Sequence, residues 1–294
     1  MKLWALIEKP DSCREAKVVK FFRCKPASNL NLVFTTRITA SSGLTKNSSL
    51  ANNFKTDLNN INKNYYRITP FLKTSENVEF TSLRSVDSSS IPLIKKILGI
   101  TKIFTLKQIH SNLVFYLNWN NANESALGRL AGDGIFTDEK GLAIGVKVAD
   151  CLPIYIFDKK YGIIAIAHAG WRGTLAQIGK NLVNAIRQKF GSSPTDLNFV
   201  LGPCIEQSCY EVGFEILSQF FNNIPGSERF FVQFNRKMYF DLKGLNRFLL
   251  NELGLTEIGS LDYCTKCHPD LFYSMRRDGT TGRNLALIYL SQEK

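Results

Sequence analysis

The chain has 294 residues, a formal net charge of +12 at pH 7, seven cysteines and three histidines. This length is ample for a large core, and we expect a single domain that spans residues 1–294. Every apolar run is shorter than the roughly 18 residues of a membrane span, and the N-terminal one is too short for a signal peptide. We therefore expect a cytoplasmic protein without membrane association.

The cysteines and the basic residues each argue against a class of protein. The cysteines are odd in number and widely spread, at positions 13, 24, 151, 204, 209, 264 and 267, which favours free thiols over a secreted disulfide scaffold. Residues 1–98 carry 16 Lys and Arg against 7 Asp and Glu. Because no helix-turn-helix, RNP or zinc-finger pattern accompanies this surplus, we expect a solvated basic face and no nucleic-acid partner.

The first elements along the chain are a strand, a long loop and a helix. Residues 31–37 predict a strand that ends in Arg37, and residues 38–64, rich in Ser, Thr, Asn and Gly, predict a loop that covers a site or moves. Residues 90–99 predict a short helix. Residues 101–117 then predict a strand that contains Gln108 and His110.

Residues 142–173 form the stretch around which the chain is organised. Two apolar runs, 152–157 and 162–167, flank a polar turn centred on residues 159–160, which predicts an antiparallel hairpin. If the hairpin is symmetric about that turn, Cys151 faces His168, with Cβ atoms roughly 4.5 to 5.5 Å apart. A one-residue bulge would turn the two side chains to opposite faces.

His168 is followed by a glycine-rich segment and then by a helical pattern. Apolar residues recur at spacings of three and four from Leu175 to Phe190, which predicts a helix there. The N–H groups at such a helix start attract anions, and Arg172 adds a planar fork suited to phosphate or carboxylate.

The C-terminal part alternates irregularly between strands and helices. Strands are predicted at 197–201, 230–239 and 284–290, and helices at 214–223 and 241–253. Because several strands lie in hairpins and no internal repeat is present, we expect a mixed sheet covered by helices.

His110, Cys151 and His168 form a candidate metal site. Three ligands from different strands would leave a fourth zinc position open for water or substrate, as in catalytic zinc sites. Spacing alone leaves a second interpretation open, because lone histidines in strands are often hydrogen-bonded core residues and free cysteines are often buried and inert.

Three further segments carry polar residues whose function the pattern leaves open. Asp133 lies between two glycines, where the backbone can approach a ligand, although a plain turn aspartate is the alternative. Cys264-Thr-Lys-Cys267-His268 matches haem attachment and half of a zinc ribbon, but without an export signal or a second Cys pair we expect a plain loop with neither haem nor a second zinc. The arginines of residues 276–283 suit an anion site or a solvated loop.

Seven short motifs resemble one known family. They are Gln-Ile-His at 108–110, Gly-Asp-Gly at 132–134, Ala-Asp-Cys-Leu-Pro-Ile at 149–154, His-Ala-Gly-Trp-Arg-Gly at 168–173, Gly-Pro-Cys-Ile at 202–205, Tyr-Glu-Val-Gly at 210–213 and Arg-Arg-Asp-Gly-Thr-Thr-Gly-Arg at 276–283. In this order they resemble the YfiH family, also called the multicopper polyphenol oxidase (laccase) or purine nucleoside phosphorylase LACC1 family. The resemblance covers roughly residues 100–290.

The resemblance implies a fold, a metal and an activity. The fold is a single-domain α+β protein, an αββα sandwich with mixed sheets related to cysteine-dependent toxin deamidases, in which residues 99–294 carry the motifs and residues 1–98 are more divergent. The metal is Zn²⁺ held by His110, Cys151 and His168. The activity is phosphorolysis of adenosine, guanosine or inosine, and methylthioadenosine, together with adenosine deamination. The copper-oxidase label fits poorly, because three histidines cannot supply the imidazoles of a multicopper cluster.

Roles can be assigned to the remaining polar residues on this basis. Cys151, His168, Arg172 and Asp150 are expected to be catalytic, with Arg172 as the phosphate ligand, and Arg37, Gln108, Asp133, Arg276 and Arg277 are expected to bind substrate. Two runs, 38–42 and 49–54, depart from the family pattern and bear on substrate preference. The alternatives are a metal-free hydrolase or deamidase, in which His168 activates Cys151, and a non-catalytic partner protein. We expect a monomer or a small homo-oligomer.

Overall fold

The computed structural model describes the backbone of residues 5–9 and 19–27, and residues 29–35, 94–95, 98–121, 130–158 and 160–291 with their side chains. Arg37 and the two runs at 38–42 and 49–54 lie outside the described residues. Within the described part of the chain, no helix combines the length and the apolar character needed to cross a membrane.

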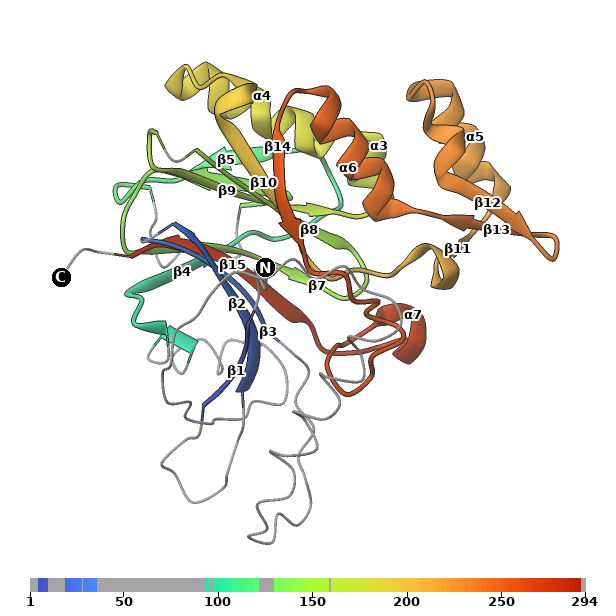
Figure 1. Ribbon diagram of the computed structural model, residues 1–294, viewed down its shortest axis with the longest axis horizontal. Coiled ribbons are helices and arrows are strands. Elements are labelled where there is room, and N and C mark those ends of the chain that lie inside the picture. The colour runs from blue at the N-terminus through green and yellow to red at the C-terminus, as the bar shows by residue number, and fades with distance from the viewer. Residues whose placement is uncertain are drawn as a thin grey trace, which may run out of the picture.

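Two six-stranded mixed sheets form the centre of the molecule (Figure 1). The first sheet has the order β1 (Ala5–Lys9), β2 (Val19–Ala27), β3 (Leu30–Thr35), β15 (Asn284–Leu290), β7 (Leu142–Val148) and β4 (Lys102–Thr105). The second has the order β14 (Thr256–Ser260), β10 (Leu197–Leu201), β8 (Leu152–Asp158), β9 (Ile163–Ala169), β6 (Gly134–Thr137) and β5 (Val114–Tyr116). Neighbouring strands are antiparallel except in the pairs β4–β7, β10–β14 and β5–β6.

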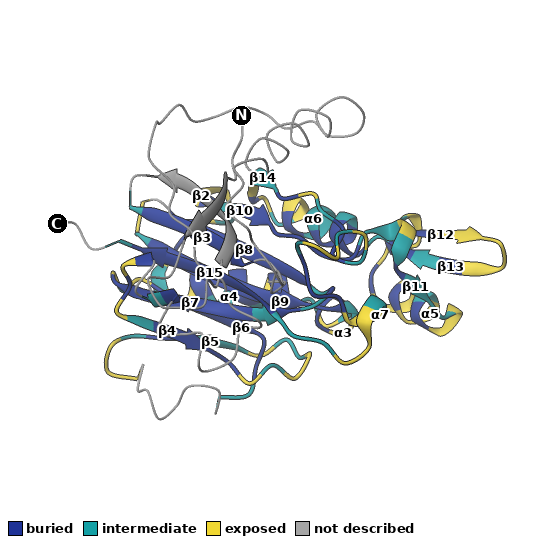
Figure 2. Ribbon diagram, turned by 90° about the horizontal axis from the view of Figure 1, so that it is seen from below, coloured by how far each residue is buried: buried dark blue, intermediate teal, exposed yellow. Residues whose placement is uncertain are grey.

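The central strands are buried on both faces (Figure 2). Every residue of β8, β9 and β15 is buried, so these segments are continuous apolar runs instead of alternating ones. One apolar cluster, which includes Phe34 of the first sheet and Ile166 of the second, fills the space between the sheets. Tyr155 of β8 donates a hydrogen bond across this space to the carbonyl of Val33, at 3.0 Å.

Helices cover the outer face of the second sheet (Figure 1). They are α3 (Trp171–Leu175), α4 (Ile178–Phe190) and α6 (Leu242–Glu252). Ile178, Leu182 and Ile186 of α4 share a core cluster with strands β8 and β9. On the outer face of the first sheet, Ile94 and Leu98, from a helical segment, pack with Val33 and Leu287. The structure is therefore a mixed α+β fold.

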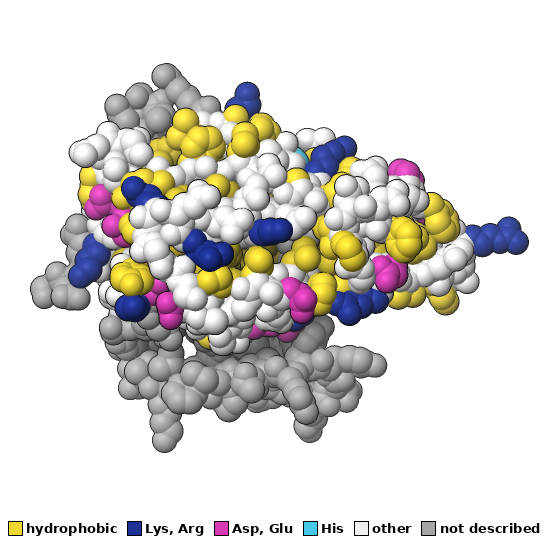
Figure 3. All heavy atoms as spheres, turned by 90° about the horizontal axis from the view of Figure 1, so that it is seen from above, with side chains coloured by type: hydrophobic (Ala, Val, Ile, Leu, Met, Phe, Trp, Pro, Cys, Tyr) yellow, Lys and Arg dark blue, Asp and Glu magenta, His cyan; other side chains and the backbone are white. Residues whose placement is uncertain are grey.

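A smaller unit projects from one end of the molecule (Figure 2). It contains α5 (Phe214–Asn223) and a three-stranded sheet of β11 (Glu211–Val212), β13 (Lys237–Phe240) and β12 (Phe231–Phe234). Figure 3 shows hydrophobic side chains on the surface of this end. The single strand predicted at 230–239 is wrong, because Asn235 and Arg236 have positive φ values of 48° and 61° and form the two-residue turn of a hairpin.

Two other predictions from the sequence are also wrong. The strand predicted at 101–117 is interrupted, since β4 ends at Thr105 and β5 begins at Val114. The helix predicted from Leu175 to Phe190 is broken at Gln177, whose φ of 56° separates α3 from α4. The elements predicted at 197–201, 214–223 and 284–290 are confirmed as β10, α5 and β15.

Candidate metal centre and its pocket

The β8–β9 hairpin brings Cys151 and His168 together, although in a different register from the predicted one. Pro153, and not Cys151, is the residue that pairs with His168. The difference is two residues, and a two-residue shift leaves both side chains on the same face of the hairpin. Cys151 and His168 are therefore diagonal neighbours, not direct partners.

The register differs because the turn is not centred where the lysines are. Asp158 pairs with Ile163, and the carboxylate of Asp158 accepts hydrogen bonds from the backbone N–H groups of Lys160 and Tyr161 at 2.8 and 3.2 Å. Gly162 has a φ of 65° and belongs to the turn, not to the strand. An aspartate that bonds to the backbone two and three residues further on is a strong local turn former, and it fixes the start of the turn.

His110, Cys151 and His168, which we call the His/Cys/His trio, converge at one point. Their ligand atoms all lie within 4.8 Å of one another, and the two imidazole rings meet edge to face with centroids 4.9 Å apart. His110 lies in the segment between β4 and β5, Cys151 in the turn before β8, and His168 in β9. Only His168 comes from a strand, so the expectation of three strand-borne ligands is wrong.

Gly170 keeps the centre of the trio open. A Cβ atom at this position would lie 2.9 Å from Sγ of Cys151 and 3.2 Å from Cδ2 of His110. A side chain here would force the Cys151 thiol or the His110 ring to shift, so glycine leaves the space that the present arrangement uses. This accounts for the glycine that follows His168-Ala in the sequence.

Asp133 organises the trio from behind. It is fully buried, and its carboxylate accepts hydrogen bonds from the backbone N–H groups of Ile109, His110 and Ser111 and from the Ser111 hydroxyl. Nδ1 of His168 lies 2.8 Å from the same carboxylate. One aspartate therefore holds the loop that carries His110, whose backbone has a φ of 60°. It also fixes the ring of His168 so that Nε2 faces the other two members of the trio.

The glycines on either side of Asp133 allow β5 and β6 to approach closely. A Cβ atom on Gly132 would lie 2.6 Å from the ring of Phe115, and one on Gly134 would lie 2.5 Å from the side chain of Val114. The Gly-Asp-Gly motif thus combines a buried acceptor with two positions at which a side chain would displace the side chains of Phe115 and Val114.

Cys151 and His168 stabilise each other's charged forms. Burial by itself raises the pKa of the Cys151 thiol, but the charge of His168 and hydrogen bonds from both histidines lower that pKa to about 6. Burial lowers the pKa of His168, but the Cys151 charge and the hydrogen bond to Asp133 raise it to about 9. For Asp133, burial raises the pKa, while hydrogen bonds from His168 and Ser111 bring it down to about 2. Cys151 is therefore a thiolate near neutral pH, the form that binds metals and acts as a nucleophile.

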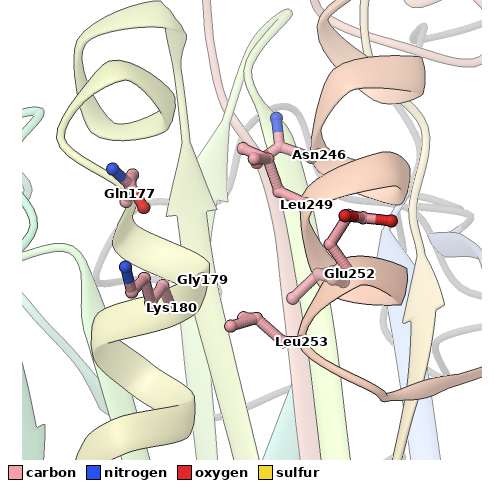
Figure 4. A pocket seen from close by; sticks show the side chains of 8 residues that line it. Gln177, Gly179, Lys180, Asn246, Leu249, Glu252 and Leu253 are labelled. Atoms are coloured by element: carbon pink, nitrogen blue, oxygen red, sulfur yellow. The ribbon is translucent and has the colours of Figure 1, made fainter. Parts of the chain in front are cut away.

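The trio opens onto a cavity of about 550 Å³. Its polar lining consists of Gln108, Lys147, Asp150, Arg276 and Arg283, and its apolar lining of Leu106, Ala149, Ile205, Tyr210 and Met275. Three of these side chains are cationic, so the cavity combines a metal-ligating corner with positive charge and an apolar wall. A smaller hollow of about 180 Å³ between α4 and α6 (Figure 4) is lined by neither Cys nor His and shares no residue with this cavity.

Residues 85–291 match the family described as multi-copper polyphenol oxidoreductase laccase. The chain belongs to this family. Purine nucleoside phosphorylase YlmD of Bacillus subtilis is 38% identical over 167 residues, which are 55% of this chain and 60% of YlmD. Adenosine deaminase RL5, from an unknown prokaryotic organism, is 35% identical over 162 residues, which are 53% of this chain and 62% of RL5. The matched regions thus span less than two thirds of both relatives.

A solved structure supports the fold over nearly the whole chain. The crystal structure of protein NMB0706 of Neisseria meningitidis superposes with a TM-score of 0.67 at 26% sequence identity. The superposition covers 92% of this chain and 99% of that protein. The arrangement of two mixed sheets with covering helices is therefore shared with that protein.

The donors of the trio suit zinc, whereas the descriptive name of the family refers to copper. One thiolate and two imidazoles are ligands that zinc binds in tetrahedral sites, with a fourth position open when the site is catalytic. A carboxylate behind one metal-binding histidine, as Asp133 lies behind His168, is the usual second layer of such sites. With three histidines in the entire chain, the imidazoles of a multicopper cluster are not available.

Gln108 and Asp150 line the cavity and also hold its walls. The Gln108 side chain forms two hydrogen bonds with the backbone of Lys147 in β7, both at 2.7 Å, one as donor and one as acceptor. The Asp150 carboxylate accepts bonds from the Thr265 hydroxyl and from the backbone N–H of Arg276, each at 2.6 Å. Asp150 therefore joins three distant segments at the cavity.

The arginines are distributed differently from the predicted roles. Arg172 is exposed, packs over the ring of Trp171 at 4.4 Å and is not part of the cavity lining, so its position does not support contact with a phosphate there. Arg277 is also absent from the lining, and its guanidinium donates to backbone carbonyls of residues 265, 266 and 272 and to Asp278. Its role in the structure is to hold a turn. Arg276 lines the cavity, and its contact with substrate stays a prediction.

Lys147, Tyr210 and Arg283 also line the cavity, although they were not predicted from the sequence. A signal existed for each of them. Lys147 is the single charge in the apolar strand β7, and Tyr210 and Arg283 lie in two of the seven motifs. Asp133 was expected to contact substrate, but its complete burial places it behind the trio.

Proposed function

We propose that this chain is a zinc-dependent purine nucleoside phosphorylase that also deaminates adenosine. The observation that carries the proposal is the cavity itself, in which the His/Cys/His trio lies beside the three cationic side chains of Lys147, Arg276 and Arg283. The names of YlmD and RL5 support both activities. The expected substrates are adenosine, guanosine or inosine, and methylthioadenosine, together with inorganic phosphate.

Arg276 and Arg283, which line the cavity where Arg172 does not, are the residues we assign to phosphate binding. Each carries a guanidinium, which can form two parallel hydrogen bonds to phosphate oxygens. Arg276 is anchored through its backbone to Asp150 and through its side chain to the carbonyl of Glu211 at 2.6 Å. Arg283 is anchored by bonds from one nitrogen to two backbone carbonyls of its own turn. Both are held at the cavity before any substrate binds.

The apolar wall accommodates the nucleoside. Ile205, Tyr210 and Met275 offer flat or flexible apolar surface against which a purine ring can pack. Burial raises the pKa of Tyr210 well above its usual range, so its hydroxyl stays protonated and remains a hydrogen-bond donor at neutral pH. Two hydrogen bonds to the backbone of Lys147 hold the Gln108 side chain in one position, so this part of the cavity wall keeps a fixed shape.

His110, Cys151 and His168 are the residues that would hold zinc. When bound there, zinc supplies Lewis-acid polarisation at its open coordination position. Asp133 accepts a hydrogen bond from Nδ1 of His168, which leaves Nε2 as the nitrogen that binds the metal once its own proton is released. The same carboxylate keeps His110 in place through three backbone N–H groups, which sets the shape of the site in advance.

Product analysis tests the proposal. The purified full chain is incubated with adenosine, with and without inorganic phosphate, and adenine, ribose 1-phosphate, inosine and hypoxanthine are separated by chromatography. Phosphorolysis predicts adenine and ribose 1-phosphate only when phosphate is present. Deamination predicts inosine without phosphate, and inosine together with its phosphorolysis product hypoxanthine when phosphate is present. A chain with a full complement of zinc that forms none of these products would contradict the proposal.

A metal-free cysteine hydrolase or deamidase is the second candidate. It is favoured by the spatial arrangement of three side chains. The Cys151 thiolate interacts with the His168 imidazole, which is hydrogen-bonded to the buried carboxylate of Asp133. Zinc and this chemistry compete for the same thiolate. Rapid alkylation of Cys151 in protein as purified would favour the hydrolase, while protection that is lost on chelation would favour zinc.

We further propose that residues 1–294 form one αββα-type domain, related to cysteine hydrolases, in a cytoplasmic protein. The two central sheets, with helical segments on both outer faces, support the domain proposal. The described cysteines are free thiols, as is usual in a reducing compartment.

A further inference from the structure

A second group of cysteines lies apart from the His/Cys/His trio. Cys209, Cys264 and Cys267, which we call the thiol cluster, place their sulfur atoms within 4.8 Å of one another. The sulfur atoms of Cys209 and Cys267 are 3.2 Å apart. The cluster joins two parts of the chain, because Cys209 ends the short 3-10 helix η3 (Gln207–Cys209), whereas the other two cysteines flank a turn near the C-terminus.

The backbone around the thiol cluster is fixed by contacts that do not involve the sulfur atoms. Cys204 and Cys264 form a parallel β-bridge, and the N–H of Thr265 donates to the carbonyl of Cys204 at 3.0 Å. Arg277 donates to the carbonyls of Thr265 and Lys266, the two residues between Cys264 and Cys267, both at 2.9 Å. The turn that presents two of the three thiols is therefore held rigidly.

Two contacts around Cys264 resemble the surroundings of a metal-binding cysteine. The N–H of Glu206 points to Sγ of Cys264 at 3.5 Å, a bond that stabilises a thiolate. His268 donates from Nδ1 to the carbonyl of Cys264 at 2.9 Å, so this nitrogen serves the backbone and not the cluster. The expectation of a plain loop considered only Cys264, Cys267 and His268; the fold replaces the histidine with Cys209.

The burial of the three thiols leaves one open side. Cys264 is only 6% exposed, Cys209 is half-buried and Cys267 is exposed. A cation can therefore enter from the side of Cys267 and reach a buried sulfur. Soft thiolate donors select Cu⁺ and Zn²⁺ among the cations available to proteins, and three thiolates match the trigonal coordination of Cu⁺ or three of the four positions of Zn²⁺.

We propose that Cys209, Cys264 and Cys267 bind one thiophilic cation, Cu⁺ or Zn²⁺, at a site separate from the His/Cys/His trio. Binding converts each participating thiol to a thiolate and releases its proton to solvent. The bound cation links η3 to the turn at residues 264–267. Tyr210, next to Cys209, lines the cavity, and Thr265 bonds to Asp150 of the same cavity. The cation thus braces one wall of the cavity without touching substrate.

Metal titration of the reduced, metal-free full chain tests the proposal. Co²⁺ serves as a spectroscopic substitute for Zn²⁺, because its thiolate charge-transfer absorption grows with the number of sulfur ligands. We expect two bound Co²⁺ per chain in the wild type. Cys267→Ser should bind one, with the loss of most of this absorption, and Cys151→Ser should bind one while most of the absorption is kept.

A matched control separates the cluster from cysteine loss in general. Cys204 is buried next to the cluster but is not part of it, so Cys204→Ala should keep both cations. Anaerobic titration with Cu⁺ against bathocuproine disulfonate, and with Zn²⁺ against EDTA, then identifies which cation the cluster retains more strongly.

The result that would overturn the proposal is an equal number of bound cations in the wild type and in Cys267→Ser, with Co²⁺, Zn²⁺ and Cu⁺ alike. Because Cys267 is exposed, this variant is expected to fold, and circular dichroism verifies that it does. A failure of the trio to bind zinc would instead appear as unchanged stoichiometry in Cys151→Ser. The two proposals therefore fail in different variants.

Discussion

The two cysteine-containing sites of this chain differ in what surrounds their sulfur atoms. The His/Cys/His trio has mixed donors, a buried carboxylate behind it and an opening to a cavity of about 550 Å³ that is lined by cations. The thiol cluster has only sulfur donors, is held by backbone contacts and does not line that cavity. In metalloproteins, an open coordination position belongs to catalysis, whereas sulfur-rich sites usually stabilise the fold. The comparison predicts that changes at the trio affect chemistry and that changes near the cluster affect stability.

Loss of a trio ligand should have the largest effect. Cys151→Ala, His110→Ala and His168→Ala should each remove the bound zinc and nearly all turnover of adenosine, because each ligand is one of three bonds to the metal. Zinc content and product formation are measured on the same samples. His268→Ala is the control, since His268 bonds to a backbone carbonyl outside the trio and should retain zinc at the trio. Full zinc occupancy of the trio in all three ligand variants would show that the ligands are wrongly assigned.

The next largest effect should come from the arginines of the cavity. Arg283→Gln removes a charged contact to phosphate, which typically costs about 2 to 4 kcal/mol, or roughly thirty- to thousandfold in rate. Arg172→Gln is the matched control, because Arg172 is exposed and outside the cavity lining, and it should change the rate less than about twofold.

The ratio of adenine to the sum of inosine and hypoxanthine formed from adenosine distinguishes a phosphate role from a general one. Arg283→Gln should lower the ratio while zinc content stays normal, because deamination needs no phosphate. If Arg172→Gln lowers the ratio and Arg283→Gln does not, the phosphate lies elsewhere than the cavity indicates.

Asp133→Asn should have an intermediate effect. Asparagine retains one acceptor oxygen for the hydrogen bonds that the carboxylate accepts from residues 109–111 and from His168. Loss of such a second layer typically lowers metal affinity by about 10- to 100-fold. Competition with a chelator measures the affinity, and Asp138→Asn, at an exposed aspartate, is the control. Equal zinc affinity in the two variants would contradict the orienting role of Asp133.

The smallest effect on catalysis should come from Lys243, which supports the backbone near the thiol cluster. Its ammonium is buried and bonds to Glu206 at 2.8 Å and to Asp262 at 3.2 Å. Lys243→Met should lower the free energy of unfolding by about 1 to 3 kcal/mol, the cost of losing hydrogen bonds to charged groups, and leave zinc at the trio. Lys237→Met, which breaks an exposed ion pair with Glu211, should change the free energy of unfolding much less, because solvent screens this pair.

The same lysine gives the stability a pH dependence. Burial by itself raises the pKa of Asp262, but the nearby charge of Lys243 lowers it by more. The pKa of Asp262 therefore lies below that of an ordinary aspartate. A carboxyl group with a lowered pKa stabilises the fold above its unfolded-state pKa, and this contribution is lost as the pH falls towards the folded-state value. Acid unfolding of the wild type should therefore show a loss of stability that is reduced in Lys243→Met. Parallel curves for the two proteins would mean that the pair contributes nothing.

The parts predictable from sequence are those in which local pattern and topology agree. Continuous apolar runs identified β10 and β15, helical spacing identified α5, and the two apolar runs around a polar turn placed Cys151 and His168 at the open end of one hairpin. The register failed because Asp158 and Gly162 relocate the turn. The strand predicted through His110 failed because Asp133, distant in sequence, captures the backbone N–H groups of that segment.

The arginines and the thiol cluster show what sequence alone does not provide. Arg172 lies in one of the seven motifs, yet it packs over Trp171 and does not line the cavity, and this depends on how α3 packs. The fold brings Cys209 next to Cys264 and Cys267. Sequence motifs for metal sites do not identify such a group, because they are based on cysteines a few residues apart in the chain.

Gly170 offers a way to separate architecture from chemistry in this protein. Its φ of −82° and ψ of 178° are values that any amino acid adopts, so the backbone itself does not require glycine at this position. What excludes a side chain is the room needed at Cys151 and His110. Alanine here would build a methyl group into the place of a ligand and leave both histidines and the thiol present. Gly170→Ala would keep every metal-binding side chain but leave no space for a metal ion. It is therefore a stricter reference for metal dependence than any variant that removes a ligand.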